Sequence, residues 1–160
     1  RVFHLYNNKT VPTEKCLKLL HKLGYDLNIL KEKDFVTQIN KMLKNEDCYF
    51  TPAKQQWEYV YSGDVAKALL AIAQNATDGT IYPIGSGKTK LLKDYILEIA
   101  EVTETKSKCN FGAIDYYPDQ TMYLCADIDN LINDTGFIPE TKFTDGIKET
   151  INYIKENNLV

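Results

Sequence analysis

The chain alternates between short apolar runs and longer stretches in which apolar residues recur every three or four positions. Strand-like runs lie at residues 2–6, 25–30, 58–61, 80–84 and 122–125. Helical patterns start near residues 13, 34, 63, 91, 127 and 144. Because helices separated by short strands are typical of α/β proteins, the pattern predicts an α/β fold.

The same pattern predicts helix ends and buried faces. We expect Asp64 in the first turn of the helix near residue 63, where a carboxylate suits the helix dipole. Gly136 is expected to end the helix that starts near 127. The predicted N-caps of the last helices are Ser62 or Gly63, Asp127 and Thr144. The residues expected to be buried on the helix near 63 are Val65, Ala66, Leu69, Leu70 and Ile72.

The run Gly87-Lys88-Thr89 matches the last residues of a phosphate-binding P-loop. That motif needs another glycine five residues before Gly87, where this sequence has Tyr82. We therefore expect a tight turn from a strand into a helix, with no phosphate held there.

Composition limits the classes of function. With 160 residues, 44% hydrophobic and 26% charged, the chain is ordinary for one soluble globular domain. A net charge of −3, with lysines scattered among acids, argues against a nucleic-acid partner or an anionic membrane surface. No apolar run approaches the length of a membrane span, and no leader pattern opens the sequence. We therefore expect no membrane partner and a cytoplasmic location.

The cysteines and histidines have none of the local spacings of a zinc site. We predict buried structural thiols and no metal. The cysteines are Cys16, Cys48, Cys109 and Cys125. Separately, residues 2–24 and 80–102 share a layout of apolar strand, polar turn and amphipathic helix. Two explanations stay open, a duplicated unit or the general likeness of any two strand–helix units.

Motifs in a fixed order resemble the extended short-chain dehydrogenase/reductases, the NAD-dependent epimerase/dehydratase family. Residues 57–68, which include W-E-Y-V-Y and D-V-A-K-A, are similar to the family's W-D-Y-x-x-x-x-D-x-A-x-A. Residues 79–87, G-T-I-Y-P-I-G-S-G, are similar to G-x-x-Y-N-I-G-S-G. Further similar segments follow in the family's order at 116–120, 126–139 and 143–147. The resemblance is greatest to the branch that includes sugar dehydratases and CDP-sugar synthases.

This resemblance implies the C-terminal substrate lobe of a Rossmann-type extended dehydrogenase/reductase, with the N-terminal dinucleotide-binding half absent. The family's G-x-x-G-x-x-G turn and its Tyr-x-x-x-Lys pair are missing from the sequence. No catalytic and no cofactor-binding residue is therefore expected, and whether the chain is an enzyme stays open. NAD or NADP is expected for the intact family and not for this chain alone. A Rossmann half or a partner chain would have to supply that site.

The resemblance also implies a site for a nucleotide sugar or another small-molecule substrate. Relatives often place an Arg at the positions of Trp57 and Tyr117 to bind the diphosphate, and this sequence lacks both. The expected substrate-binding residues are Gln56, Trp57, Tyr59, Tyr117 and Gln120. An alternative stays open in which Trp57 and Tyr59 are core aromatics.

Residues 1–36 resemble another member of the superfamily. Their F-H-L-Y-N and L-G-Y runs are similar to a stretch near the end of thioester-reductase domains. We therefore predict a thioester-reductase-like βα segment at 1–36 and an epimerase/dehydratase-like substrate-binding portion at 37–160. The expected function is substrate binding for an NAD(P)-dependent sugar-nucleotide epimerase, dehydratase or reductase. The alternatives are a non-catalytic α/β binding or assembly module and a fragment of a thioester reductase.

Overall fold

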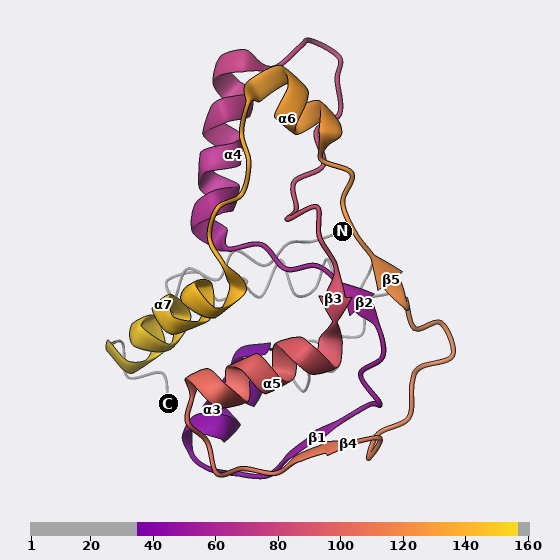
Figure 1. Ribbon diagram of the computed structural model, residues 1–160, viewed down its shortest axis with the longest axis vertical. Coiled ribbons are helices and arrows are strands. Elements are labelled where there is room, and N and C mark those ends of the chain that lie inside the picture. The colour runs from indigo at the N-terminus through magenta and orange to yellow at the C-terminus, as the bar shows by residue number, and fades with distance from the viewer. Residues whose placement is uncertain (1–34, 157–160) are drawn as a thin grey trace, which may run out of the picture. The chain divides into compact units, whose positions relative to one another are not determined.

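The computed structural model describes residues 35–156 of the chain (Figure 1). The chain divides into two compact units, Arg1–Gln38 and Ile39–Val160, and every described strand belongs to the second. The predictions for the strands at 2–6 and 25–30, the first helix and Cys16 lie outside the described residues. The described elements are, in chain order, α3 (Phe35–Leu43), β1 (Cys48–Phe50), β2 (Gln56–Trp57), α4 (Ser62–Asn75), β3 (Lys90–Leu91), α5 (Leu92–Val102), β4 (Cys109–Phe111), β5 (Tyr123–Leu124), α6 (Asp129–Thr135) and α7 (Phe143–Glu156).

Short strands form two separate sheets within residues 35–156. β1 pairs in parallel with β4, and the stacked rings of Phe50 and Phe111, partners in this ladder, have centroids 5.5 Å apart. In the other sheet, β2 lies between an antiparallel β3 and a parallel β5. Both parallel pairs join strands that are distant in the sequence. The α/β fold is confirmed.

The strand predictions are right only in part. β5 falls inside the predicted run at 122–125, whereas β2 comes just before the run at 58–61. The run at 80–84 joins no ladder with the described residues, and Ile81 there is 81% exposed. The pattern misses β1, β3 and β4, since two or three residues are too few to display alternation.

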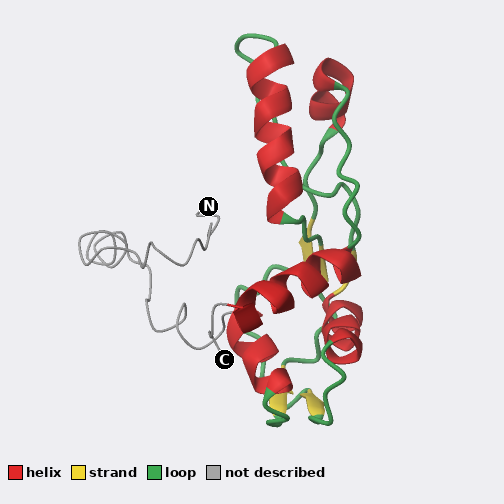
Figure 2. Cartoon of the chain, turned by 90° about the vertical axis from the view of Figure 1, so that its left-hand side faces the viewer, coloured by secondary structure: helices red, strands yellow, loops and turns green. Residues whose placement is uncertain are grey.

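The helices α4 and α6 lie side by side (Figure 2) and share a small core. Ala68 of α4 is buried with Ile128 and Leu131, and the aromatic or aliphatic side chains of 82, 84 and 137 pack around them. The predicted buried face of α4 is therefore wrong for three of its five residues, while Ile72 does pack against this core. Ala66, Leu69 and Leu70 are exposed, and Val65 and Ile72 are only half-buried. The helix turns its small Ala68 toward α6, which places the bulkier leucines outside.

A second cluster joins α5 to α7, which pack on each other. Tyr95, Ile96 and Ile99 of α5 are buried, as are Ile147, Ile151 and Ile154 of α7. These spacings place each set on one helical stripe, and both helices lie where the helical patterns near residues 91 and 144 predict them. No helix within residues 35–156 is long and apolar enough to cross a bilayer.

The helix caps differ from the predicted ones. Tyr61 is the N-cap of α4 and its side chain makes no capping bond, so Ser62 and Gly63 are wrong. Thr144 lies inside α7 and is not its cap. The Asp127 carboxylate does accept the Asp129 N–H at 3.1 Å, although Ile128 is the N-cap of α6. Gly136 ends α6 with φ +69°, as predicted, because a left-handed residue suits a glycine.

Candidate functional site

Two extended segments lead from one sheet to the other, residues 51–57 after β1 and residues 112–122 after β4 (Figure 1). We call them the paired segments. Backbone N–H groups donate between these segments and their ends from Ile114 to Phe50 O (3.3 Å), from Lys54 to Tyr116 Oη (2.9 Å) and from Gln56 to Met122 O (2.8 Å). The segments are therefore tied together at these points, near both of their ends.

The paired segments bring four of the five predicted substrate-binding residues onto adjacent stretches of chain. Gln56 and Trp57 lie on the first, Tyr117 and Gln120 on the second. Gln56 and Tyr117 are exposed, whereas Trp57 and Gln120 are half-buried. The Trp57 indole N–H donates to Thr121 O at 2.9 Å, so this ring has its face rather than its N–H to offer a ligand.

Tyr59 lies elsewhere, in an aromatic cluster with Tyr95 and Phe143. Its ring meets Tyr95 edge-on with centroids 4.9 Å apart and lies 5.9 Å from Phe143. Burial, and then the neighbouring Tyr95, raise the pKa of Tyr59 to about 12. The ammonium of Lys90 lies 4.3 Å from the centre of the Tyr95 ring and pairs with the Glu98 carboxylate. Tyr59 therefore has the surroundings of a core aromatic residue, which was the alternative to a substrate-binding role.

The glycine turn at 85–87 holds a carboxylate of the protein itself. Glu58 Oε2 accepts the N–H groups of Ser86 (2.9 Å) and Gly87 (2.8 Å) and the Ser86 hydroxyl (3.1 Å). Glu58 Oε1 accepts the N–H of Ala126. Successive backbone N–H groups of this kind would otherwise suit a phosphate. The Glu58 carboxylate occupies them, in agreement with the expectation that no phosphate is held in this turn.

The start of α5 is closed in a similar way. The Leu92 N–H donates to Gln55 O at 2.8 Å, and the Lys93 N–H donates to Ala53 O at 3.0 Å. Ala53 reaches this position with φ +52°, which is unusual for a residue with a Cβ. The carbonyls of residues 53 and 55 therefore satisfy amides that could otherwise attract an anion.

Gln55 has a buried acceptor that the described residues leave without a donor. The side chain is 2% exposed, and its Oε1 meets no hydrogen-bond donor within residues 35–156. A buried acceptor of this kind costs free energy until a donor reaches it. Gln55 Oε1 is therefore a buried acceptor that only a buried water or a donor from outside the described residues would satisfy.

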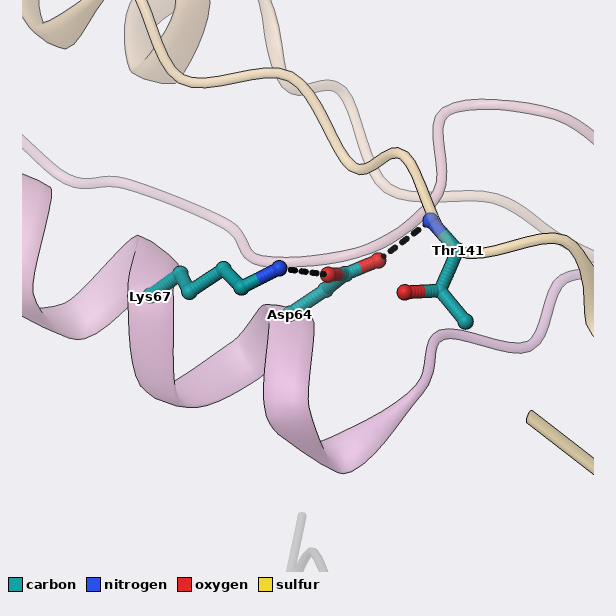
Figure 3. Close-up of polar contacts among 3 residues, drawn as sticks. All are labelled: Asp64, Lys67 and Thr141. Carbon is teal, nitrogen blue, oxygen red and sulfur yellow. Dashed lines mark hydrogen bonds and ion pairs between the residues drawn. The ribbon is translucent and has the colours of Figure 1, made fainter. Parts of the chain in front are cut away.

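Asp64 ties the start of α4 to the loop that precedes α7 (Figure 3). Its carboxylate is 1% exposed and accepts the Thr141 N–H at 2.8 Å and the Lys67 ammonium at 3.3 Å. Burial opposes the charge, but the hydrogen bonds from Thr141 and Lys67 outweigh it and hold the pKa of Asp64 below its ordinary value. Asp64 is a first-turn helix residue, as predicted, with a tertiary contact that the sequence does not reveal.

The described residues 35–156 contain no group of three or more His, Cys, Asp or Glu placed to hold a metal ion. Cys48, Cys109 and Cys125 are free thiols, of which Cys48 is buried and the other two are half-buried. Among these three, the prediction of buried thiols is therefore right for Cys48, and Cys109 and Cys125 are only half-buried.

Comparison with known proteins adds to this geometry. No protein-family model matches the chain. The CDP-abequose synthase of Salmonella muenchen is 30% identical over 115 residues, which cover 71% of this chain and 39% of that protein. The trifunctional UDP-glucose 4,6-dehydratase/UDP-4-keto-6-deoxy-D-glucose 3,5-epimerase/UDP-4-keto-L-rhamnose-reductase of Arabidopsis thaliana is 26% identical over 101 residues, which cover 62% of this chain and 15% of that protein.

Solved structures share the fold. The enzyme WbmF of Bordetella bronchiseptica, solved with NADH, superimposes with a TM-score of 0.65 at 25% identity and covers 77% of this chain. The chain is a relative of the extended short-chain dehydrogenase/reductases. The UDP-glucose 4-epimerase of Thermotoga maritima, solved with UDP-glucose, superimposes with a TM-score of 0.69 at 20% identity and covers 76% of this chain.

This chain matches only part of the length of these extended dehydrogenase/reductases. The chain spans 36% of the WbmF chain, 39% of the Thermotoga epimerase chain and 39% of the Salmonella synthase. This coverage agrees with the predicted fold class, the C-terminal lobe of a Rossmann-type member of the family. Glu58, which joins three segments of the lobe, is a residue that the motif comparison passed over. The only feature of the sequence that marks Glu58 is its position between the two aromatic residues of the W-E-Y run.

Proposed function

We propose that residues 37–160 are the substrate-binding portion of an NAD(P)-dependent sugar-nucleotide epimerase, dehydratase or reductase, and that this portion is not catalytic alone. The observation that carries the proposal is the juxtaposition of Gln56 and Trp57 with Tyr117 and Gln120 on the paired segments. Two of the similar solved structures support the proposal, because WbmF was solved with NADH and the Thermotoga epimerase with UDP-glucose. NAD or NADP would then bind to a separate dinucleotide-binding half.

The proposed site would recognise a nucleotide through stacking and neutral hydrogen bonds. The exposed Tyr117 and the half-buried Trp57 offer aromatic faces, on which stacking of a base is worth roughly 1–3 kcal/mol. Gln56 and Gln120 offer amide groups, and Lys54 is the exposed cation of the first paired segment. Because a single lysine binds a diphosphate as a point charge and not bidentately, we expect weaker diphosphate binding than in relatives with arginines.

The dinucleotide-binding half would dock at the α4–α6 end of this lobe. Leu69 and Leu70 of α4 are 52% and 59% exposed, and Ile81 is 81% exposed in a segment that forms no ladder with the described residues. Large apolar side chains with this much exposed surface favour a protein contact over solvent. The occupant we propose is the Rossmann half, either from the same gene product or from a partner chain.

Fluorescence titration tests the substrate site, because Trp57 is the only tryptophan of the chain. CDP-, UDP- and dTDP-sugars should quench its emission saturably. Tyr117→Ala should weaken the best ligand by about tenfold, the loss of one stacking face. Tyr153→Ala, at a 40% exposed tyrosine of α7, is the matched control and should leave the affinity unchanged. The absence of quenching and of calorimetric heat with all three ligand classes would overturn the proposed site.

The docking proposal has its own test. The chain would be mixed with a separately produced dinucleotide-binding half of the Salmonella synthase, and binding measured by sedimentation. Leu70→Glu should lower the affinity by at least about tenfold, since it would bury a charge. Leu97→Glu, at a 46% exposed leucine of α5, is the matched control. Equal effects of the two substitutions would contradict the proposed docking face and leave the substrate site untouched.

A second candidate is a non-catalytic α/β binding or assembly module. The observation that favours it is the loss of the two arginine positions, now Trp57 and Tyr117, together with a glycine turn filled by Glu58. Binding of a nucleotide sugar without turnover after addition of the Rossmann half and NAD(P) would favour this module. The thioester-reductase likeness of residues 1–36 and the cytoplasmic location remain predictions.

A further inference from the structure

Cys48 and Cys109 are direct partners in the parallel ladder of β1 and β4. Neighbouring strands lie about 4.8 Å apart, and partners on one ladder point to the same face of the sheet. Two residues further along, Phe50 and Phe111 occupy the next pair on that face, and their rings stack with centroids 5.5 Å apart. Side chains of this face therefore do meet across the ladder, which places the two thiols side by side.

We propose that Cys48 and Cys109 form a reversible disulfide, so that this pair is a redox-modification site. The Cα separation of paired strands falls within the range of about 4.4–6.8 Å that disulfides span. Both thiols are free in this structure, where the Cys48 thiol lies 3.5 Å from the Glu46 carbonyl. Bond formation requires rotation of the two side chains and little movement of the backbone.

The two thiols differ in access, which sets the order of the reaction. Cys48 is fully buried and Cys109 is half-buried, so an oxidant reaches Cys109 first. With a low-molecular-weight disulfide as oxidant, the Cys109 thiolate attacks one of its sulfurs and releases one thiolate. The Cys48 thiolate then attacks the Cys109 sulfur of the mixed disulfide and releases the second. The two released thiolates take up the two protons lost by the protein, and the oxidant is reduced to two thiols.

The position of the pair gives the bond a consequence. β1 leads directly into residues 51–57 and β4 into residues 112–122, so a Cys48–Cys109 bond would tie the paired segments together at one end. Their other end is joined where β2 pairs with β5. Oxidation would therefore restrict the separation of the stretches that carry Gln56, Trp57, Tyr117 and Gln120. The disulfide itself does not depend on the proposed function of those residues.

Oxidised glutathione is the probe that tests this inference on the full chain. After treatment, thiol titration should fall from four groups to two, and peptide mapping should recover Cys48 linked to Cys109. The thermal midpoint should rise by about 5–15 °C, because the bond closes a long loop, and dithiothreitol should reverse all three changes.

Matched variants make the outcome decisive. The Cys16→Ser/Cys125→Ser double variant should still lose two thiols, whereas Cys109→Ser should form no internal bond. If Cys48→Ser fails to fold because its position is buried, Cys109→Ser at the more accessible position still decides the question. Recovery of Cys48 and Cys109 as unlinked thiols or separate glutathione adducts would overturn the proposal. A cross-link through Cys16 or Cys125 in their place would overturn it as well.

Discussion

The Glu58 carboxylate accepts the backbone N–H of Gly87 at 2.8 Å and so fills a turn that resembles a phosphate loop. The same oxygen accepts the N–H of Ser86, while the other accepts the N–H of Ala126. One side chain thereby joins the end of β2 to the turn before β3 and to the chain after β5. Glu58 is a structural anion built into the lobe, in the place where a ligand anion would otherwise bind.

We predict that Glu58→Gln destabilises the lobe by about 1–3 kcal/mol, because an amide replaces one acceptor oxygen with a donor that faces backbone N–H groups. Urea unfolding monitored by circular dichroism measures the change. Glu101→Gln, at an exposed position of α5, is the control and should change stability by less than about 0.5 kcal/mol. Equal effects of the two substitutions would contradict the role of Glu58.

Gly85→Ala is expected to destabilise the lobe by about 1–3 kcal/mol through overpacking. A Cβ at residue 85 would lie 2.6 Å from the Cβ of Ala126 and would also meet the Glu58 carboxylate. The double variant Gly85→Ala/Ala126→Gly should recover part of the loss, since it removes one of the two clashes. A double-mutant cycle on denaturation midpoints gives the coupling, and strict additivity would show that the contact is unimportant.

Asp64 gives a prediction on the pH dependence of stability. Its pKa is lowered in the folded state, so its contribution is present above the unfolded value of about 3.9 and is lost as pH falls through the folded pKa. Asp64→Asn should therefore cost about 1–3 kcal/mol at pH 7, with a smaller difference from the wild type below about pH 4. Asp78→Asn, at an exposed position, should show no such trend. A difference that stays constant down to pH 2.5 would argue against the ionised Asp64.

Tyr59 predicts a loss of stability at high pH. Its pKa is raised to about 12, so the folded state keeps the proton while the unfolded chain releases it near pH 10. By pH 11 this difference amounts to about 1 kcal/mol of lost stability. Tyr59→Phe removes the titrating group, and its stability should decline less steeply between pH 9 and 11 in urea titrations. Parallel declines for the two proteins would show that Tyr59 ionises normally in the folded state.

Local pattern was enough to locate most of the helices of the described chain. The stripes Tyr95, Ile96 and Ile99 on α5 and Ile147, Ile151 and Ile154 on α7 follow the helical period, because burial of one face is a local property of a helix. Gly136 was readable for a similar reason, since a left-handed residue after a helix favours glycine regardless of the rest of the fold.

Strand pairing and helix contacts were not readable in this way. β1 and β4 form a ladder because two segments distant in the sequence meet in the fold. Each strand has only three residues, too few for an alternating pattern to predict it. The buried side of α4 is set by the approach of α6 to Ala68, and therefore the more apolar Leu69 and Leu70 lie outside.

The sequence by itself determined the α/β class, the ordered family motifs and the absence of a glycine fingerprint and a Tyr-x-x-x-Lys pair, because each of these is a matter of residue type and spacing. Only the tertiary structure decided that Glu58 fills the 85–87 turn, that Tyr59 joins an aromatic cluster, and that Cys48 lies beside Cys109. These three relationships depend on contacts between segments far apart in the chain. Local propensity does not predict such contacts, since their geometry arises only when the segments pack.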